Sequence, residues 1–150
     1  MSAAGEGARP GGETRCAAPL REDHSNRNVY AIDHVQLAMP TAAEAVARQF
    51  YCGLLGLEEL PKPPNLEARG GLWFACGALQ VHLGVDTDFR AAKKAHPALR
   101  VRNLGQLRAA LETAGHTIKL DPEAIAGVER FFTEDPFGNR IEFVAPKGSS

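Results

Sequence analysis

The chain has 150 residues, of which 44% are hydrophobic, and its 17 basic and 18 acidic residues give a formal net charge of -1. This length and composition allow one sizeable hydrophobic core, or two small half-cores that share an interface. The balanced charge gives no electrostatic footprint for nucleic acid or an anionic membrane, and no apolar run approaches the ~20 residues that span a bilayer.

The cysteines are few and show no metal-binding or redox spacing. Cys16, Cys52 and Cys76 are odd in number and lack a C-x-x-C motif. Small secreted domains held by disulfides carry an even, closely spaced set of cysteines. We therefore expect reduced thiols in a cytoplasmic protein.

The N-terminal segment differs in composition from the rest of the chain. Residues 1–28 are rich in Gly, Ala, Ser, Glu and Arg and contain almost no large apolar side chains. Such a segment cannot bury enough surface to offset its ordering entropy, so we predict a disordered extension. It has no apolar h-region, which excludes a secretory signal, and its four acidic residues are atypical of a transit peptide. We place the folded part at residues 29–146 and a tail at 147–150.

The folded part opens with an alternating segment. Within residues 30–39, Val35 and Leu37 fall on one face, whereas His34 and Gln36 fall on the other. This period of two predicts a strand with a mixed second face.

A helix and a group of strands are expected to follow. Thr41-x-x-Glu44 resembles a capping box and predicts a helix that runs through Leu54. A second strand with His82 and Gln80 on one face is predicted to close a hairpin that turns at Gly77. The expected elements after the helix are a strand at 57–60, a proline-rich loop at 61–64, and hairpin strands at 71–76 and 78–85.

The second half repeats this order. A strand is expected from His96, with His96 and Arg100 on the face opposite Leu99. Asn103-x-x-Gln106 predicts the start of a helix, and Ala114-Gly115 predicts its end. Three more strands are expected at 116–120, 128–133 and 140–145.

Both halves thus read as β-α-β-β-β, which predicts an internal duplication. The modules span about 29–88 and 95–146. The predicted fold class is α+β, with the two βαβββ modules forming a curved, mostly antiparallel mixed sheet around a cleft.

The last strand carries a carboxylate in an apolar setting. Asp135-Pro136 and Gly138-Asn139 are typical of a turn, and the strand after it alternates. Ile141 and Phe143 point to one side, and Arg140 and Glu142 point to the other. A carboxylate at such a position is usually a solvated strand residue, but it can also be a metal ligand.

Four residues occupy matching positions on the first and last strands of the two halves. They are His34 and His82, separated by 48 residues, and His96 and Glu142, separated by 46. If the halves pair about a pseudo-twofold axis, these side chains converge on one cleft. Imidazole and carboxylate suit Zn, Ni, Co, Mn or Fe(II), and four such ligands leave two adjacent octahedral positions for water or substrate oxygens.

Three segments carry a family resemblance. Ile32-Asp33-His34-Val35, His96-Pro97-Ala98-Leu99-Arg100-Val101 and Asp135-Pro136-Phe137-Gly138-Asn139-Arg140-Ile141-Glu142 resemble the vicinal oxygen chelate superfamily. That group includes glyoxalase I, bleomycin- and fosfomycin-resistance proteins, extradiol dioxygenases and methylmalonyl-CoA epimerase. The resemblance covers about residues 30–146 and implies that His34, His82, His96 and Glu142 bind a divalent metal ion. The chain departs from glyoxalase I at His82, where that enzyme usually has a carboxylate or amide ligand.

The resemblance implies a metal-dependent lyase or isomerase of glyoxalase type. The ion would chelate two adjacent oxygens of a small-molecule substrate and stabilise an enediolate, with Glu142 or His82 as the base. Two alternatives stay open: a ring-cleaving dioxygenase that uses Fe(II) or Mn, and a metal-free, bleomycin-resistance-like protein that sequesters a ligand.

Other polar residues share the face of the candidate ligands. Arg100, Arg140, Gln36 and Gln80 are therefore candidates for substrate binding. By analogy with the family, we expect a homodimer. In some members of that family the site combines modules of two chains.

Overall fold

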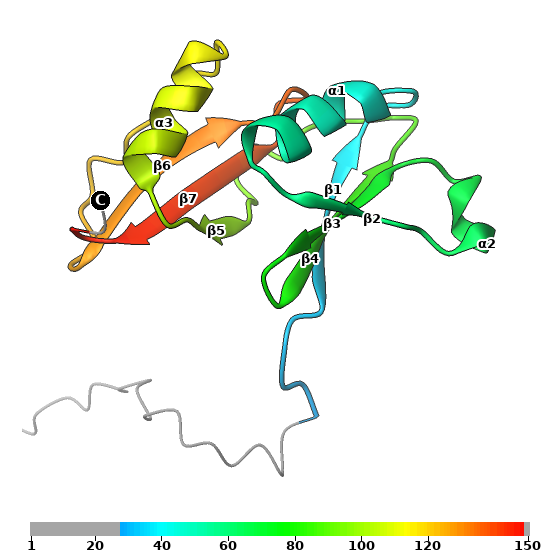
Figure 1. Ribbon diagram of the computed structural model, residues 1–150, viewed down its shortest axis with the longest axis horizontal. Helices are drawn as coiled ribbons and strands as arrows, with labels where there is room; N and C mark the ends of the chain where they lie inside the picture. Colours follow the sequence, from blue (N-terminus) through cyan, green and yellow to red (C-terminus); the bar gives the residue numbers. More distant parts are fainter. Residues whose placement is uncertain (1–27, 149–150) are drawn as a thin grey trace, which may run out of the picture. The chain divides into compact units, whose positions relative to one another are not determined.

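The computed structural model describes residues 28–148 (Figure 1). The extension predicted to be disordered, residues 1–28, lies almost entirely outside the described residues, and so does the end of the tail predicted at 147–150. The compact unit that contains every described helix and strand begins at Ile32. No helix among the described residues is long and apolar enough to cross a membrane.

The first half forms a four-stranded mixed sheet with the strand order β1-β4-β3-β2. The first and last strands, β1 and β4, run parallel to each other, whereas the remaining neighbours are antiparallel. The elements are β1 (His34–Met39), α1 (Glu44–Arg48), the π-helix η1 (Gln49–Leu54), β2 (Glu58–Leu60), α2 (Pro64–Glu67), β3 (Leu72–Cys76) and β4 (Leu79–Val85).

The second half forms a three-stranded mixed sheet with the order β5-β7-β6. Its first and last strands, β5 and β7, again run parallel, and β6 is antiparallel to β7. The elements are β5 (Ala98–Arg100), α3 (Leu104–Thr113), β6 (Val128–Glu134) and β7 (Arg140–Pro146). The α+β class is confirmed. The strands form two separate sheets, which do not close on each other, in place of the single curved sheet that was predicted.

The prediction of a strand at 116–120 is wrong. Only Lys119 pairs there, through backbone hydrogen bonds of 2.8 Å in both directions with Phe132. The carboxylate of Asp121 then accepts a hydrogen bond from the backbone N–H of Glu123, and Pro122 has no N–H to offer to a ladder. This turn ends the pairing after a single bridge.

Of the two predicted helix caps, one is correct. The side chain of Asn103 accepts a hydrogen bond of 2.8 Å from the backbone N–H of Gln106, as expected. The capping box at Thr41 is wrong, because α1 begins after Ala43 without a side-chain cap. Glu44 instead accepts a hydrogen bond of 3.0 Å from the backbone N–H of Gly71, so its carboxylate ties the helix to the entrance of β3.

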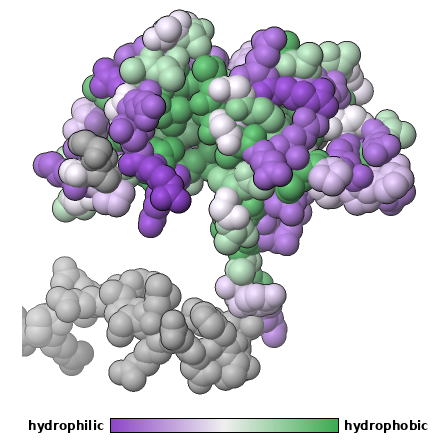
Figure 2. All heavy atoms as spheres, in the orientation of Figure 1, coloured by the Kyte–Doolittle hydropathy of each residue, from purple (hydrophilic) through white to green (hydrophobic). Residues whose placement is uncertain are grey.

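The hydrophobic core lies between the sheets and the longer helices. Figure 1 shows α1 and α3 on the same side of the strands, and Figure 2 shows apolar residues gathered in the middle of the face, flanked by polar ones. Each fully buried large side chain stabilises the fold by about 1.5–3 kcal/mol. The core includes Met39, Phe50, Tyr51, Phe74, Leu83, Leu111, Phe131, Ile141 and Phe143.

A buried carboxylate connects the two halves. Asp135 is 4% exposed, and one of its oxygens accepts hydrogen bonds from the backbone N–H groups of Phe137 and Asn139. The other oxygen accepts from the Tyr51 hydroxyl at 2.8 Å and from the Asn139 amide at 2.9 Å. The same amide donates to the carbonyl of Ala38 at 2.8 Å. The predicted turn between β6 and β7 is therefore fastened to η1 and to β1.

This network predicts a large effect of one hydroxyl. Burial, together with the Asp135 charge, raises the pKa of Tyr51 well above its usual value, so the hydroxyl stays a donor. Tyr51→Phe should lower the free energy of unfolding by about 1–3 kcal/mol, because a buried carboxylate oxygen loses one of its donors. Urea unfolding monitored by circular dichroism measures this change. Tyr30→Phe is the matched control, since Tyr30 is 79% exposed, and an equal effect of both substitutions would contradict the role of the network.

Candidate metal centre

The polar face of the first sheet places His34 and His82 side by side. They lie on the parallel neighbours β1 and β4, with their ring centroids 4.2 Å apart and their planes 15° apart. Trp73 on β3 is directly opposite His82 in the ladder and stacks on its other side at 4.3 Å. His82 is consequently only 5% exposed and forms the middle of a three-ring stack.

Hydrogen bonds orient both imidazoles. Nδ1 of His34 lies 2.7 Å from the Asp33 carboxylate, which leaves its Nε2 available as a ligand atom. Nε2 of His82 lies 2.8 Å from the side-chain oxygen of Gln80. Burial lowers the pKa of His82, and electrostatic interactions with His34 and Lys62 lower it further, whereas the Asp33 carboxylate acts in the opposite direction. His82 is therefore held as a neutral imidazole with one lone pair on its ring.

This pair faces a cavity of about 530 Å³. Gln36 and Gln80, predicted as substrate-binding residues, both line it. Lys62 and Arg69 also line it, so the cavity has basic as well as aromatic walls. The sequence analysis did not find these two cations, because they lie between β2 and β3, in the loop before α2 and in the turn after it.

The second sheet brings His96 and Glu142 together. His96 lies just before β5, and Glu142 on β7 is paired with Ala98 in the ladder. Nε2 of His96 is 3.0 Å from Oε2 of Glu142, and Nδ1 of His96 is 2.8 Å from the backbone carbonyl of Lys94. Glu142 is 8% exposed, so it is a buried carboxylate and not a solvated strand residue.

Arg130 is a site residue that the sequence analysis missed. It lies on β6 and donates to Oε1 of Glu142 at 3.0 Å and to Asp121 at 2.7 Å. Its Nε is buried without a hydrogen-bond partner in the described part of the chain. The alternation of β6 puts Arg130 on the same face as Phe132, and this pattern in the sequence could have indicated that Arg130 faces the site. Its contact with Glu142, however, depends on the register between β6 and β7.

The contacts of His96 create an electrostatic requirement. A backbone carbonyl can only accept, so Nδ1 of His96 must carry the proton that it shares with Lys94. In a neutral imidazole, Nε2 then directs a lone pair toward the Glu142 carboxylate. Two acceptors at 3.0 Å repel each other unless a positive charge lies between them, either a second ring proton or a metal cation.

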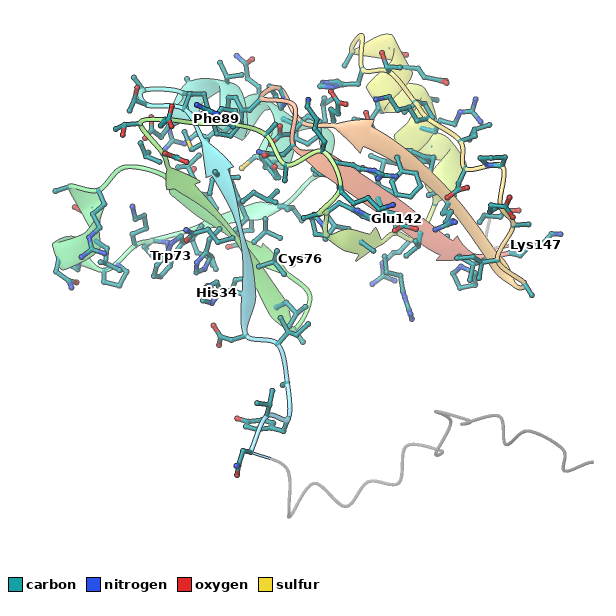
Figure 3. The ribbon with its side chains drawn as sticks, turned by 180° about the vertical axis from the view of Figure 1, so that it is seen from behind. His34, Trp73, Cys76, Phe89, Glu142 and Lys147 are labelled. Atoms are coloured by element: carbon teal, nitrogen blue, oxygen red, sulfur yellow. The ribbon has the colours of Figure 1, made fainter. Side chains whose placement is uncertain are left out.

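The two pairs do not meet within one chain. In residues 28–148, no three His, Cys, Asp or Glu side chains are grouped so that they could hold a metal ion. Figure 3 shows His34 on β1 and Glu142 on β7, in different sheets. One chain therefore offers two separate half-sites, each with two of the four predicted ligands.

The two predicted substrate-binding arginines occupy the second sheet. The guanidinium of Arg140 covers the ring of Phe132 at 4.1 Å. Arg100 is exposed at the end of β5. Both residues share the side of the sheet that carries Glu142.

The Arg130–Glu142 pair leads to a stability prediction. Its side chains are 17% and 10% exposed, so Arg130→Met leaves a buried carboxylate without its cation. Loss of one partner of such a pair should lower the free energy of unfolding by about 3 kcal/mol. Arg108→Met is the matched control, because the Arg108–Glu112 pair is 45% and 48% exposed and should contribute less than about 1 kcal/mol. Similar midpoints for the two variants in urea unfolding would refute this assignment.

Comparison with known proteins identifies a family with this architecture. A family model described as Glyoxalase/Bleomycin resistance protein/Dioxygenase superfamily matches residues 31–143. No curated protein sequence matches the chain significantly. A crystal structure of a protein from Bacillus anthracis assigned to the glyoxalase family is 45% identical, with a TM-score of 0.76, and covers 81% of this chain and 98% of its own.

Two more distant structures share the fold. The fosfomycin resistance protein FosX from Listeria monocytogenes is 12% identical, with a TM-score of 0.64 and coverage of 80% of this chain and 96% of its own. Lactoylglutathione lyase from Agrobacterium tumefaciens is 19% identical, with a TM-score of 0.59 and coverage of 79% and 96%. With the family model matching most of the folded unit, the chain belongs to the Glyoxalase/Bleomycin resistance protein/Dioxygenase superfamily.

Proposed function

We propose that this protein is a metal-dependent lyase or isomerase of glyoxalase type, acting on a small molecule with two adjacent oxygens. In this proposal His34, His96 and Glu142 bind a divalent ion, and His82, which stacks on His34, is the base or a fourth ligand. The observation that carries the proposal is the 3.0 Å approach of Nε2 of His96 to Oε2 of Glu142, a contact that requires a positive charge between the two atoms. The 45% identity to a glyoxalase-family protein supports the reaction class.

The donor atoms fit a divalent ion. Two ligands at right angles, each about 2.1 Å from one ion, are about 3 Å apart, as Nε2 and Oε2 are. Ligating histidines usually donate their second N–H to a carboxylate or a carbonyl, and His34 and His96 have such partners in Asp33 and Lys94. Imidazole and carboxylate together suit Zn, Ni, Co, Mn or Fe(II).

The chain's own residues then have distinct roles. A bound ion would supply Lewis-acid polarisation of the two substrate oxygens. Arg130 donates a hydrogen bond to Oε1 of Glu142, which leaves Oε2 directed at His96. The lowered pKa of His82 keeps it unprotonated, which suits a residue that removes a proton from the substrate. Because Glu142 is already engaged by two partners, we favour His82 over Glu142 as the base.

We further propose that a second copy of the chain completes the site. Each chain has a His34–His82 half-site and a His96–Glu142 half-site, and a twofold dimer would bring the first half of one chain to the second half of the other. The edge strands β1 and β5 have no neighbour on their outer sides in the described residues. Next to β1, Ile32 and Leu79 are 61% and 36% exposed. Exposed apolar side chains at this edge support a second chain that covers it.

The proposal predicts about one divalent ion per chain in protein that is purified without metal and then titrated with Zn, Ni, Co, Mn and Fe(II). His96→Ala and Glu142→Gln should each abolish tight binding, because each removes one of three ligands. Calorimetry and elemental analysis after desalting measure this. His116→Gln is the matched control, since the imidazole of His116 contacts the Glu134 carbonyl away from both half-sites.

The same measurement can locate the site between subunits. A heterodimer of a His34→Ala chain and a Glu142→Gln chain, isolated with two different tags, keeps one intact combination of half-sites and loses the other. It should bind one ion, whereas each homodimer of the variants should bind none. A heterodimer without a bound ion would exclude the shared site, and wild-type protein that binds no ion would leave ligand sequestration as the function.

The reaction class has a separate test. The metal-loaded protein should convert hemithioacetals without consuming oxygen, because proton transfer between adjacent carbons needs no oxidant. Turnover is followed by thioester absorbance, and an oxygen electrode records uptake with a panel of catechols. Oxygen uptake with a catechol, without hemithioacetal turnover, would identify a dioxygenase instead. His82→Ala should lower turnover at least about 100-fold while metal binding is retained, if His82 is the base.

A further inference from the structure

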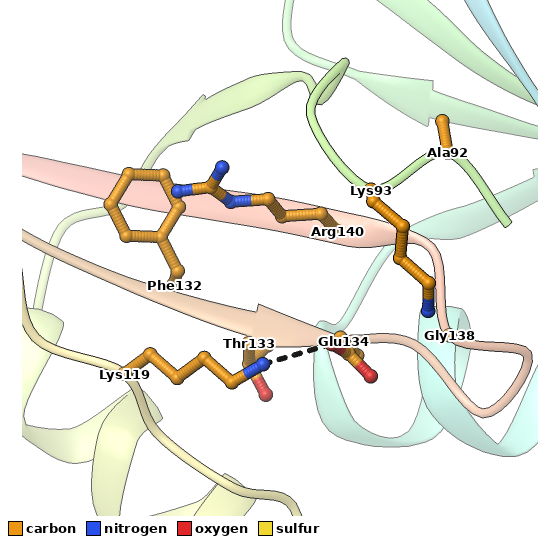
Figure 4. Close-up of a pocket in the computed structure, with 8 residues that line it drawn as sticks. All are labelled: Ala92, Lys93, Lys119, Phe132, Thr133, Glu134, Gly138 and Arg140. Carbon is orange, nitrogen blue, oxygen red and sulfur yellow. Dashed lines mark hydrogen bonds and ion pairs between the residues drawn. The ribbon is translucent and has the colours of Figure 1, made fainter.

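A small basic cavity lies next to the His96–Glu142 half-site. Its volume is about 230 Å³, which is room for several waters or for a small oxyanion. Figure 4 shows the residues around it, which come from β6, β7, the turn between them, the bridge segment before β6 and the linker before β5. The lining residues are Ala92, Lys93, Lys119, Phe132, Thr133, Glu134, Gly138 and Arg140.

The charges around this cavity do not balance. Three cations, Lys93, Lys119 and Arg140, line it together with one carboxylate, Glu134. Lys119 donates to Glu134 at 3.0 Å, and this bond, with the charge of Lys93, lowers the pKa of Glu134. Glu134 is thus ionised and paired with Lys119. The positive charges of Lys93 and Arg140 remain without a carboxylate partner in the cavity.

Arg140 is the most informative of these residues. Its guanidinium has five N–H donors, and among residues 28–148 its side chain makes neither a hydrogen bond nor an ion pair. Glu134 is its direct partner across the ladder but is bonded to Lys119. Arg140 instead stacks on the ring of Phe132, which fixes the plane of the guanidinium and leaves its donor edge unused.

Phe132 connects this cavity to the candidate metal centre. The edge-to-face contact between the rings of Phe132 and His96 has a centroid distance of 5.3 Å, while Arg140 covers Phe132 at 4.1 Å. A single aromatic ring thus separates the unused guanidinium from the imidazole of a proposed ligand. Neither His96 nor Glu142 lines the cavity, so a molecule held by them would need a side group that extends past Phe132 to reach it.

We propose that this cavity is an oxyanion subsite. Arg140 would bind a carboxylate, phosphate or phosphonate through two N–H groups, and Lys93 would add a second positive charge. That the oxyanion belongs to the substrate rests on the proposed function. The substrate would then be an acid that carries its anionic group about one aromatic ring away from the two chelated oxygens.

The test uses the full chain, freed of metal with a chelator, and inorganic phosphate or acetate as the probe. Titrations are followed by backbone amide NMR at constant ionic strength, because surface charges are screened by salt. Saturable shifts at Lys93, Gly138 and Arg140 are expected, and Arg140→Gln should weaken binding at least about tenfold. Tighter binding of phosphate would indicate a phosphoryl or phosphonyl group, and tighter binding of acetate would indicate a carboxylate.

Two controls make the outcome decisive. Arg102→Gln removes an exposed arginine outside the cavity and should leave the affinity unchanged, whereas Lys93→Gln should weaken it. Absence of saturable binding, or equal weakening by Arg102→Gln and Arg140→Gln, would overturn the subsite. His34→Ala should keep phosphate binding while it loses the metal. Failure of metal binding alone would refute only the proposed function, and failure of phosphate binding alone would refute only the subsite.

Discussion

The buried carboxylate of Asp135 is the constraint on which the rest of this structure depends. It accepts hydrogen bonds from its own turn and from Tyr51, and Asn139 of the same turn reaches the carbonyl of Ala38 on β1. These contacts join residues that are 84 and 101 positions apart in the sequence. A buried carboxylate without these donors would be unfavourable by several kcal/mol, so the network opposes separation of the two halves.

The same turn determines which residues of β7 face the candidate site. Because side chains alternate along a strand, a shift of one residue would place Glu142 in the core and Ile141 on the polar face. The Asp135 network fixes where β7 starts, and the buried side chains of Ile141 and Phe143 hold it in that register. Stability and site geometry therefore depend on one turn.

The two half-sites have different electrostatic character. In the first, stacked rings and burial keep His82 neutral between Trp73 and His34. In the second, Arg130 donates to Oε1 of Glu142, whose Oε2 lies 3.0 Å from Nε2 of His96. In the proposed site, His82 as a base and Glu142 as a ligand would suit proton transfer beside a cation. The proposed oxyanion subsite, where Arg140 covers the ring of Phe132, would favour an acidic substrate.

The sequence alone determined the features that depend on neighbouring residues. Alternation placed His34, His82 and Glu142 on the polar faces of their strands, and the duplicated order predicted two half-folds with matching candidate ligands. The cap at Asn103 was also predictable, because its partner Gln106 lies within one helical turn. Features decided by distant residues were not predictable. Glu44 finds Gly71 and not the start of its own helix, and the register between β6 and β7 brings Arg130 to Glu142.

Tertiary structure also decided that the candidate ligands form two pairs and not one cluster. The sequence pattern reports which face a side chain occupies, and that is a local property of each strand. The distance between the faces of two sheets depends on how the core packs between them, and on the turn that Asp135 holds in place. Hydrogen-bond networks of this kind arise only in the folded chain, since their donors and acceptors come from segments far apart in the sequence.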